Sequence, residues 1–189
     1  AKYACWIFTG FLIAFAVKIP LFPFHTWQPN TYSTAPMAGT MLLSAIMLKM
    51  ALFGMIKWMI GLNQSALTYW QWPVIILGVI GILYGAFIAM REVNIRKVFA
   101  FASISHLGLI AAGIMVFSLD SIQGSIIQMI NHSLIAIGLF LAAGIIEDRL
   151  GTTNLREMGG IAKIAPRFGF WFGVILFISL SVPMTAGFI

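Results

Sequence analysis

The sequence predicts an all-α fold, a polytopic membrane helix bundle of about six transmembrane helices. The first observation is composition: 61% of the 189 residues are hydrophobic and only 8% are charged, whereas about a quarter of the residues in soluble domains are charged. The second is that apolar residues gather in runs near the roughly 20 residues that a helix needs to cross a bilayer. These runs are Tyr3–Ile19, Met37–Ile60, Pro73–Met90, Val98–Phe117, Gly124–Ile146 and Phe168–Ile189.

The first run ends at a predicted helix break. Lys18 stands just before Pro20 and Pro23, and proline cannot continue the helical hydrogen-bond ladder. We therefore expect the first membrane helix to be broken at Pro20/Pro23, with carbonyl groups freed beside Lys18. A polar, aromatic loop that contains His25 is expected to lead from the break to Pro36.

The second run places Lys49 near its middle, twelve residues after Met37. That spacing corresponds to about 18 Å of helix, too far for the side chain to snorkel out of the hydrocarbon core. A lysine inside a span costs at least about 2.5–3.5 kcal/mol on insertion scales, so it usually has a partner and a function. We expect Lys49 to face a polar interior or to be held neutral. A buried lysine paired only for packing is the alternative.

The fourth and fifth runs each carry a histidine near mid-membrane depth. His106 is central in its run, near Ser103 and Ser105, and His132 has Gln128 one turn before it on the same helix face. Histidine titrates near neutrality and can pass protons between neighbours. The alternative for each is a hydrogen-bonded core histidine. Gly85, Gly138 and Pro183, which lie inside the apolar runs, are tolerated in membrane helices because neighbouring elements satisfy the freed backbone groups.

The charged residues between the runs predict the topology. Lys and Arg are concentrated in the two loops that would share one side, as Arg91, Arg96, Lys97, Arg149, Arg156, Lys163 and Arg167. The opposite side has Lys57 and Lys2, and its segments Asn63–Trp72 and Ser118–Gln123 contain no Lys or Arg. By the positive-inside rule the basic side is cytoplasmic, and by parity the Pro20–Pro36 loop lies there too.

Four ionisable side chains inside or beside the spans are candidate members of a proton relay: Lys18, Lys49, His106 and His132. We expect them to form a lateral line bridged by water, although Lys18 is near the end of its run and could snorkel instead. The role of His25 stays open between a relay member and a hydrogen-bonded loop residue.

The histidine spacing does not match zinc motifs and no acidic residue lies inside a span, so we predict no metal site. Aromatic and basic residues are not interleaved, which argues against a nucleic-acid partner.

These motifs resemble those of a known family. Lys18-Ile-Pro-Leu-Phe-Pro-Phe-His-Thr-Trp-Gln-Pro, then Ala35-Pro-Met-Ala-Gly-Thr and Leu48-Lys49, resembles the antiporter-like subunits of respiratory complex I. Arg96-Lys97-Val-Phe-Ala-Phe-Ala-Ser-Ile-Ser-His106 looks like that family's basic loop and Ser-x-Ser-His helix. The resemblance continues through Asn131-His132, Asp148-Arg149, Gly159-Gly160 and Ala186-Gly-Phe-Ile189. It is greatest for the M-type subunit (chain 4), because of the Ala-Pro-x-x-Gly-Thr turn and Lys49.

The resemblance implies that residues 1–189 are one membrane domain, an internal fragment of a larger antiporter-like bundle. It implies proton translocation coupled to NADH:quinone electron transfer, with Lys18, Lys49, His106 and His132 on a central hydrophilic axis. NADH, FMN, iron–sulfur clusters and quinone would belong to partner subunits, with no cofactor in this chain. The implied partners are other membrane-arm subunits and the lipid bilayer. The expected location is the cytoplasmic membrane of a cell, preferred over the mitochondrial inner membrane.

The sequence departs from the family pattern around the break, where Gln28, Asn30 and Tyr32 replace the usual Leu, Asp and His. A subunit of a multisubunit cation/proton antiporter or of a membrane-bound hydrogenase would share the same axis. A structural membrane scaffold with stabilising buried polar groups is the alternative from another class. The choice between proton and sodium as the transported ion also stays open.

Overall fold

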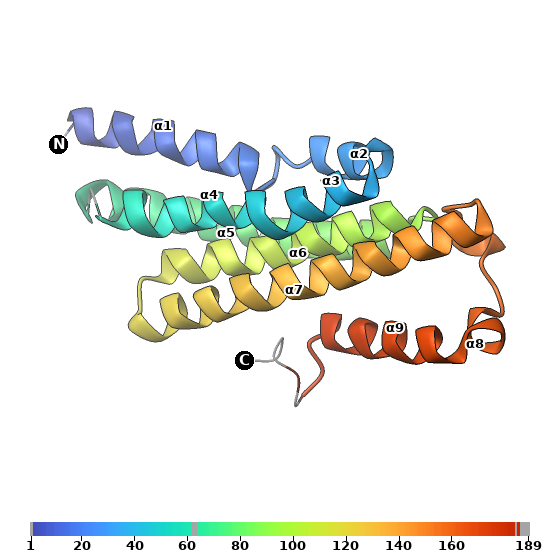
Figure 1. Ribbon diagram of the computed structural model, residues 1–189. Coiled ribbons are helices and arrows are strands. Elements are labelled where there is room, and N and C mark those ends of the chain that lie inside the picture. Colours follow the sequence, from blue (N-terminus) through green and yellow to red (C-terminus); the bar gives the residue numbers. More distant parts are fainter. Residues whose placement is uncertain (1, 62–63, 184, 186–189) are drawn as a thin grey trace.

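The computed structural model describes residues 2–61, 64–183 and 185, and across these ranges it consists of helices without a β-strand. The expected all-α class is thereby confirmed (Figure 1). The elements in chain order are α1 (Lys2–Lys18), α2 (Trp27–Thr34), α3 (Met37–Leu42), η1 (Leu43–Met47), α4 (Leu48–Gly54), η2 (Met55–Ile60), α5 (Gln64–Ala89), α6 (Ile95–Val116), α7 (Leu119–Leu150), η3 (Leu155–Glu157), α8 (Ile161–Ile164) and α9 (Pro166–Ser179).

The six expected apolar runs correspond to helices. Four are long and apolar enough to cross a membrane, namely Met37–Ile60, Leu67–Ala89, Ile95–Val116 and Leu119–Leu150. Two shorter apolar helices, Cys5–Lys18 and Pro166–Ser179, match the first and last runs. The last run was expected to reach Ile189, but its helix, α9, already ends at Ser179. Residue 184 and the Ala186–Ile189 motif lie outside the described residues.

The third run was expected to begin at Pro73, but α5 begins at Gln64 and contains Pro73 in its interior. Hydropathy detects the part of a helix that lies at hydrocarbon depth, whereas aromatic residues such as Tyr69 and Trp72 favour the membrane interface and can still be helical. The described part of the expected Asn63–Trp72 connection is therefore helix, and Asn63 lies outside the described residues.

The first membrane helix is broken as expected, but the break is shorter than predicted. The expected loop from Pro20 to Pro36 contains α2, so the chain resumes a helix at Trp27. The two prolines interrupt the ladder only locally, and the Trp27 indole Nε1 donates 2.9 Å to the Val17 carbonyl oxygen at the break. In Figure 1, α1 ends near the middle of the bundle's length, and α2 continues toward one of its ends.

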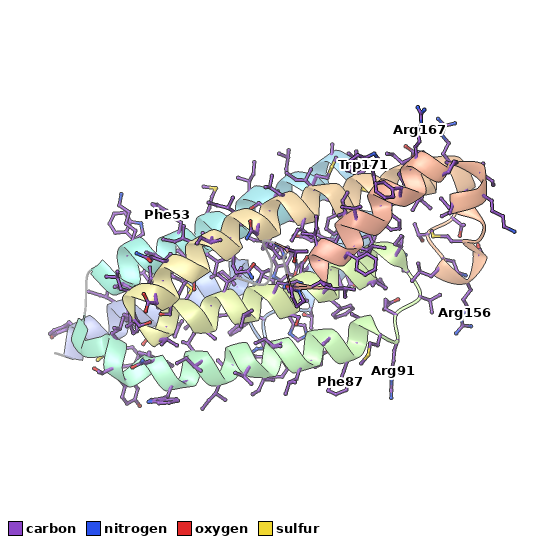
Figure 2. The ribbon with its side chains drawn as sticks, turned by 90° about the horizontal axis from the view of Figure 1, so that it is seen from below. Phe53, Phe87, Arg91, Arg156, Arg167 and Trp171 are labelled. Atoms are coloured by element: carbon purple, nitrogen blue, oxygen red, sulfur yellow. The ribbon has the colours of Figure 1, made fainter. Side chains whose placement is uncertain are left out.

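The chain crosses back and forth between the two ends of the bundle (Figure 1). The α5–α6 and α7–α8 connections lie at the same end, and the Ile95 amide donates to the Thr153 carbonyl across them. Figure 2 shows Arg91, Arg156 and Arg167 at this end. The Arg96 guanidinium also reaches the Ala35 carbonyl, 2.8 Å away, at the end of α2. The end of the Pro20–Pro36 segment thus lies beside the basic end, as expected, whereas the break at its start lies near the middle of the bundle's length (Figure 1).

Helices α5 and α6 approach each other closely at two glycines. A Cβ added at Gly78 would lie 2.8 Å from the Gly108 carbonyl oxygen, and one added at Gly108 would lie 2.6 Å from the Gly78 oxygen. Small residues allow such backbone contact between membrane helices. The Ser105 hydroxyl adds a 3.0 Å hydrogen bond to the Ile82 carbonyl. This contact fixes α6, and with it His106, against α5.

Candidate functional site

Lys49 and His132 are in direct contact. The Lys49 Nζ lies 2.7 Å from His132 Nδ1 and donates 2.6 Å to the Ser44 carbonyl oxygen. His132 is only 4% exposed. When Lys49 is charged it has three donors and no acceptor; in that state Nδ1 of a neutral His132 accepts, and its ring proton lies on Nε2. The mid-span lysine that the sequence singled out therefore has a titratable partner on another helix, α7.

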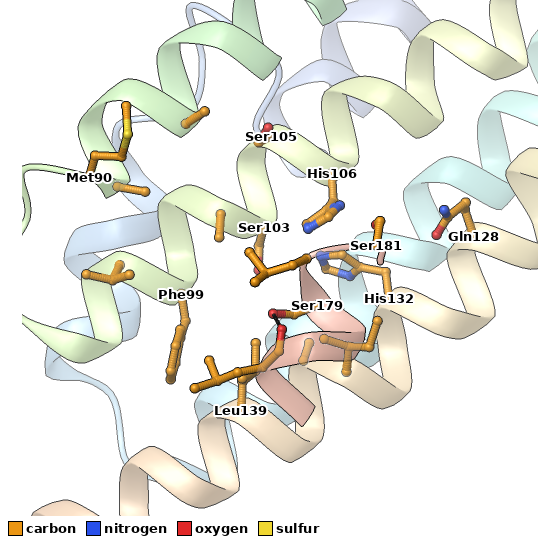
Figure 3. Close-up of a pocket in the computed structure, with 18 residues that line it drawn as sticks. Met90, Phe99, Ser103, Ser105, His106, Gln128, His132, Leu139, Ser179 and Ser181 are labelled. Carbon is orange, nitrogen blue, oxygen red and sulfur yellow. Dashed lines mark hydrogen bonds between the residues drawn. The ribbon is translucent and has the colours of Figure 1, made fainter. Parts of the chain in front are cut away.

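His106 continues the series on the other side of His132. The two ring centroids are 5.6 Å apart with an interplanar angle of 62°, and Figure 3 shows the rings facing each other between α6 and α7. Ser179, at the end of α9, lines a cavity together with His106. The order Lys49, His132, His106 thus leads from α4 through α7 to α6.

A cavity of about 340 Å³ adjoins the two histidines. Its polar lining consists of His106, His132, Gln128, Ser103, Ser105, Ser179 and Ser181, and its apolar lining comes from α5, α6, α7 and α9 (Figure 3). A water molecule takes ~30 Å³ in the liquid, so the cavity has room for several. Gln128 and His132 line the same space, as their shared helix face predicts. The cavity can therefore hold water between hydroxyl, amide and imidazole groups.

The structure does not bring Lys18 into this series. Its side chain is exposed in this chain, and it makes no hydrogen bond or ion pair with another residue in the described part. Helix α1 lies beside α4 (Figure 1). The predicted line of four is therefore contiguous for Lys49, His132 and His106 only, and the relay roles of all four residues remain predictions.

His25 lies in the turn after the break, as expected, and is buried there. It is 4% exposed, its ring stacks on Phe22 at 5.5 Å between centroids, and it meets Tyr84 edge-on at 4.6 Å. Neither ring nitrogen has a hydrogen-bond partner among the described residues. The reading of His25 as a hydrogen-bonded loop residue does not match this environment, and His25 does not touch the Lys49–His132 pair.

The family model described as NADH:quinone oxidoreductase/Mrp antiporter, transmembrane, matches residues 2–189. The chain belongs to this family. The match covers all of the helices that carry the candidate relay, so the resemblance read from the sequence motifs is confirmed.

Relatives of this antiporter-family chain include NAD(P)H-quinone oxidoreductase chain 4-2 of Synechocystis, 38% identical over 97% of this chain and 33% of the relative. Among solved structures, respiratory complex I from Thermus thermophilus with bound NADH gives a TM-score of 0.92 at 28% identity, over 98% of this chain and 40% of that one. The Mrp complex from a Dietzia species gives 0.83 at 26%, over 91% and 32%. The chain thus spans about a third of the length of the curated relative.

Near the basic end, the sequence placed Arg96 in a loop and left Glu147 either solvated or ion-paired with a nearby basic residue. The Arg96 side chain is 10% exposed and pairs with Glu147 at 2.5 Å between Nη2 and Oε2. Its Nε donates to the same carboxylate at 2.8 Å, and its Nη1 donates to the Ala35 carbonyl at 2.8 Å. One guanidinium thus ties together α2, α6 and α7 in the antiporter-family chain. No local signal pairs residues so far apart in sequence.

Two π-helical segments, η1 and η2, interrupt the second span and were missed. The first of them, Leu43–Met47, ends just before α4 and provides the Ser44 carbonyl that accepts from Lys49. Single π turns inside α-helices are frequent at functional sites.

In the described part of this antiporter-family chain, no group of three or more His, Cys, Asp or Glu side chains could hold a metal ion.

Proposed function

We propose that the chain forms part of a chain 4 type membrane subunit of a proton-translocating NADH:quinone oxidoreductase, with Lys49, His132 and His106 as a proton relay. The observation that carries the proposal is the 2.7 Å contact between Lys49 Nζ and His132 Nδ1, inside the bundle. A proton donor and its acceptor must lie within about 2.6–3.2 Å or be linked by one water. The name of the Synechocystis relative supports the coupling to quinone reduction.

The relay works by changes of protonation at stated atoms. The Lys49 ammonium gives a proton to His132 Nδ1, which makes His132 an imidazolium. The imidazolium releases its Nε2 proton to the water and hydroxyl groups of the adjoining cavity, from which His106 accepts one. His132 is then neutral with its proton on Nδ1, and the neutral Lys49 amine accepts a hydrogen bond from that N–H. The cycle closes when Lys49 takes up a new proton and the Nδ1–H proton returns to Nε2 through the cavity water.

The remaining parts of the assignment follow from the resemblance. Lys18 would be the half-channel lysine, and because it is exposed in this chain, its acidic partner would come from outside residues 1–189. NADH, FMN, iron–sulfur clusters and quinone would be held by partner subunits, and the other membrane-arm subunits would be the chain's neighbours. As part of such an enzyme, the chain would be a multi-pass protein of the cytoplasmic membrane of a cell.

The test is proton pumping by the intact complex in sealed vesicles, with NADH oxidation followed in parallel. Replacement Lys49→Ala removes the first proton donor of the series, so we expect the rate of proton pumping to fall at least about tenfold, a barrier increase of ~1.4 kcal/mol. The complex should remain assembled.

The matched control is Lys57→Ala, which removes an exposed lysine of the same span that lies over the Phe53 and Trp58 rings. It should pump as the wild type does. If Lys49→Ala also pumps normally at normal turnover, Lys49 has only a structural role and the scaffold alternative gains.

The likeness to the Mrp complex keeps a cation/proton antiporter as a second candidate. Replacing sodium by potassium in the same vesicles separates the two. Proton pumping that is unchanged without sodium favours the oxidoreductase subunit, whereas proton movement that requires sodium favours the antiporter.

A further inference from the structure

Ser133 stands beside His132 on α7 and points at the π-helical segment that precedes Lys49. We propose that Ser133 is a positioning residue, which holds η1 so that the Ser44 carbonyl and the His132 imidazole converge on the Lys49 ammonium. The functional part of this inference rests on the proposed role of Lys49. The positional part concerns geometry alone and can be tested without it.

The first step is the geometry of η1. A π turn interrupts the regular i→i−4 ladder, and side chains can insert at such points. Two consecutive carbonyls of this segment accept hydrogen bonds from side chains. The Ser44 oxygen accepts from Lys49 Nζ at 2.6 Å, and the Ala45 oxygen accepts from Ser133 Oγ at 2.9 Å. The Ser44 carbonyl of η1 thus accepts from Lys49 of α4, and the Ala45 carbonyl accepts from Ser133 of α7.

The second step concerns the Ser133 hydroxyl, which has a single hydrogen to donate. It lies 2.8 Å from the Met129 carbonyl, one turn back on its own helix, and 2.9 Å from the Ala45 carbonyl on another element. A serine inside a helix commonly bonds only to the i−4 carbonyl. The additional Ala45 contact therefore links α7 to η1, at the residue next to His132.

The third step joins these contacts into a ring. Ser44 and Ala45 are neighbours in η1, and His132 and Ser133 are neighbours in α7. Lys49 closes the ring through its contacts with Ser44 and His132. The span Met37–Ile60 and α7 are thus joined by two separate contacts, Ser133 Oγ with the Ala45 carbonyl and Lys49 Nζ with His132 Nδ1, and two contacts fix their relative rotation as a single one could not.

The consequence of losing the hydroxyl follows from helix geometry. Without a donor on the Ala45 carbonyl, η1 can relax to a regular α-helix and change the register by one residue. A one-residue change turns the following helix by about 100°. That rotation would carry Lys49 away from His132 Nδ1.

The structural test is cryo-electron microscopy of the intact complex. In Ser133→Ala, residues 43–47 should lose the π turn and Lys49 Nζ should leave His132 Nδ1. In Ser133→Thr, which keeps a hydroxyl, both features should remain. An unchanged π turn with an unchanged Lys49–His132 contact in Ser133→Ala overturns the inference.

Ser125→Ala is the matched control, because Ser125 lies on the same helix, donates to the Ser121 carbonyl at 2.7 Å and reaches the Ile110 carbonyl of α6 at 3.4 Å, rather than a carbonyl of η1. It should leave the π turn intact. If Ser133→Ala does not assemble, Ser133→Cys provides the same comparison, since a thiol still fills the space of the hydroxyl but is a weak donor. A Lys49–His132 contact unchanged in Ser133→Cys also contradicts the inference.

The functional test uses protons pumped per NADH oxidised. Ser133→Ala should lower this ratio several-fold, Ser133→Thr should restore it, and Ser125→Ala should match the wild type. Normal pumping by Lys49→Ala would remove the proposed function, while the structural comparison would still decide whether Ser133 positions Lys49. A displaced Lys49 with normal pumping in Ser133→Ala would show that positioning is real and has no part in transport.

Discussion

At the scale of single residues, an ionisable side chain inside a membrane span predicts a functional site. The sequence does not predict which residue that side chain contacts. Lys49, His106 and His132 were identified because each lies near mid-membrane depth, and the structure places them in series. The direct contact between Lys49 and His132 depends on the rotation of α4 relative to α7. That rotation is set by the π turn of η1, for which a single sequence offers no pattern.

Replacement of Lys49 by arginine separates charge from proton release. An arginine guanidinium keeps its proton under all physiological conditions, so Lys49→Arg can donate hydrogen bonds but cannot pass a proton to His132. We expect the rate of proton pumping to fall as far as in Lys49→Ala, while assembly is kept, as measured in sealed vesicles. Wild-type pumping by Lys49→Arg would mean that the transported proton does not pass through residue 49.

At the scale of elements, hydropathy located the six membrane segments but not the ends of the helices. The missed helix α2 is polar and short, and its burial comes from packing of Tyr32 against Phe140 rather than from its own apolar character. The early start of α5 was missed because interfacial residues have low hydropathy. Both errors arise because an apolar run reports depth in the bilayer, whereas helix formation depends on backbone hydrogen bonds and packing.

The Arg96–Glu147 pair predicts how these elements are held together. Arg96→Met keeps an unbranched apolar stem but leaves the Glu147 carboxylate and the Ala35 carbonyl without this donor. Breaking a buried pair costs ~3–5 kcal/mol, and because Glu147 is 30% exposed, we expect about 2 kcal/mol. Amide hydrogen exchange of α2 in the complex should rise. Arg91→Met, at an exposed position of the same loop, should leave it unchanged, and an equal rise in both variants would contradict the role of the pair.

At the scale of the whole molecule, the basic loops predict one orientation. In a Cys5→Ser background, cysteines at exposed positions Arg91, Arg156 and Asp120 report on the two ends of the bundle. We expect Arg91→Cys and Arg156→Cys to react with a membrane-impermeant maleimide from the cytoplasmic side only, and Asp120→Cys from the opposite side only. Labelling of all three from one side would contradict the topology.

A small tilt of helix α7 would change the distance between Lys49 and His132. It is anchored by Glu147 near one end and carries His132 fifteen residues away, a lever arm of ~22 Å at 1.5 Å per residue. A tilt of about 3° around the Glu147 anchor would displace His132 by ~1 Å over that arm. Since proton transfer tolerates only about 2.6–3.2 Å between heavy atoms, this small tilt is enough to open or close the Lys49–His132 contact. Under the proposed relay, a slight tilt of α7 would therefore make or break the proton-transfer step between Lys49 and His132.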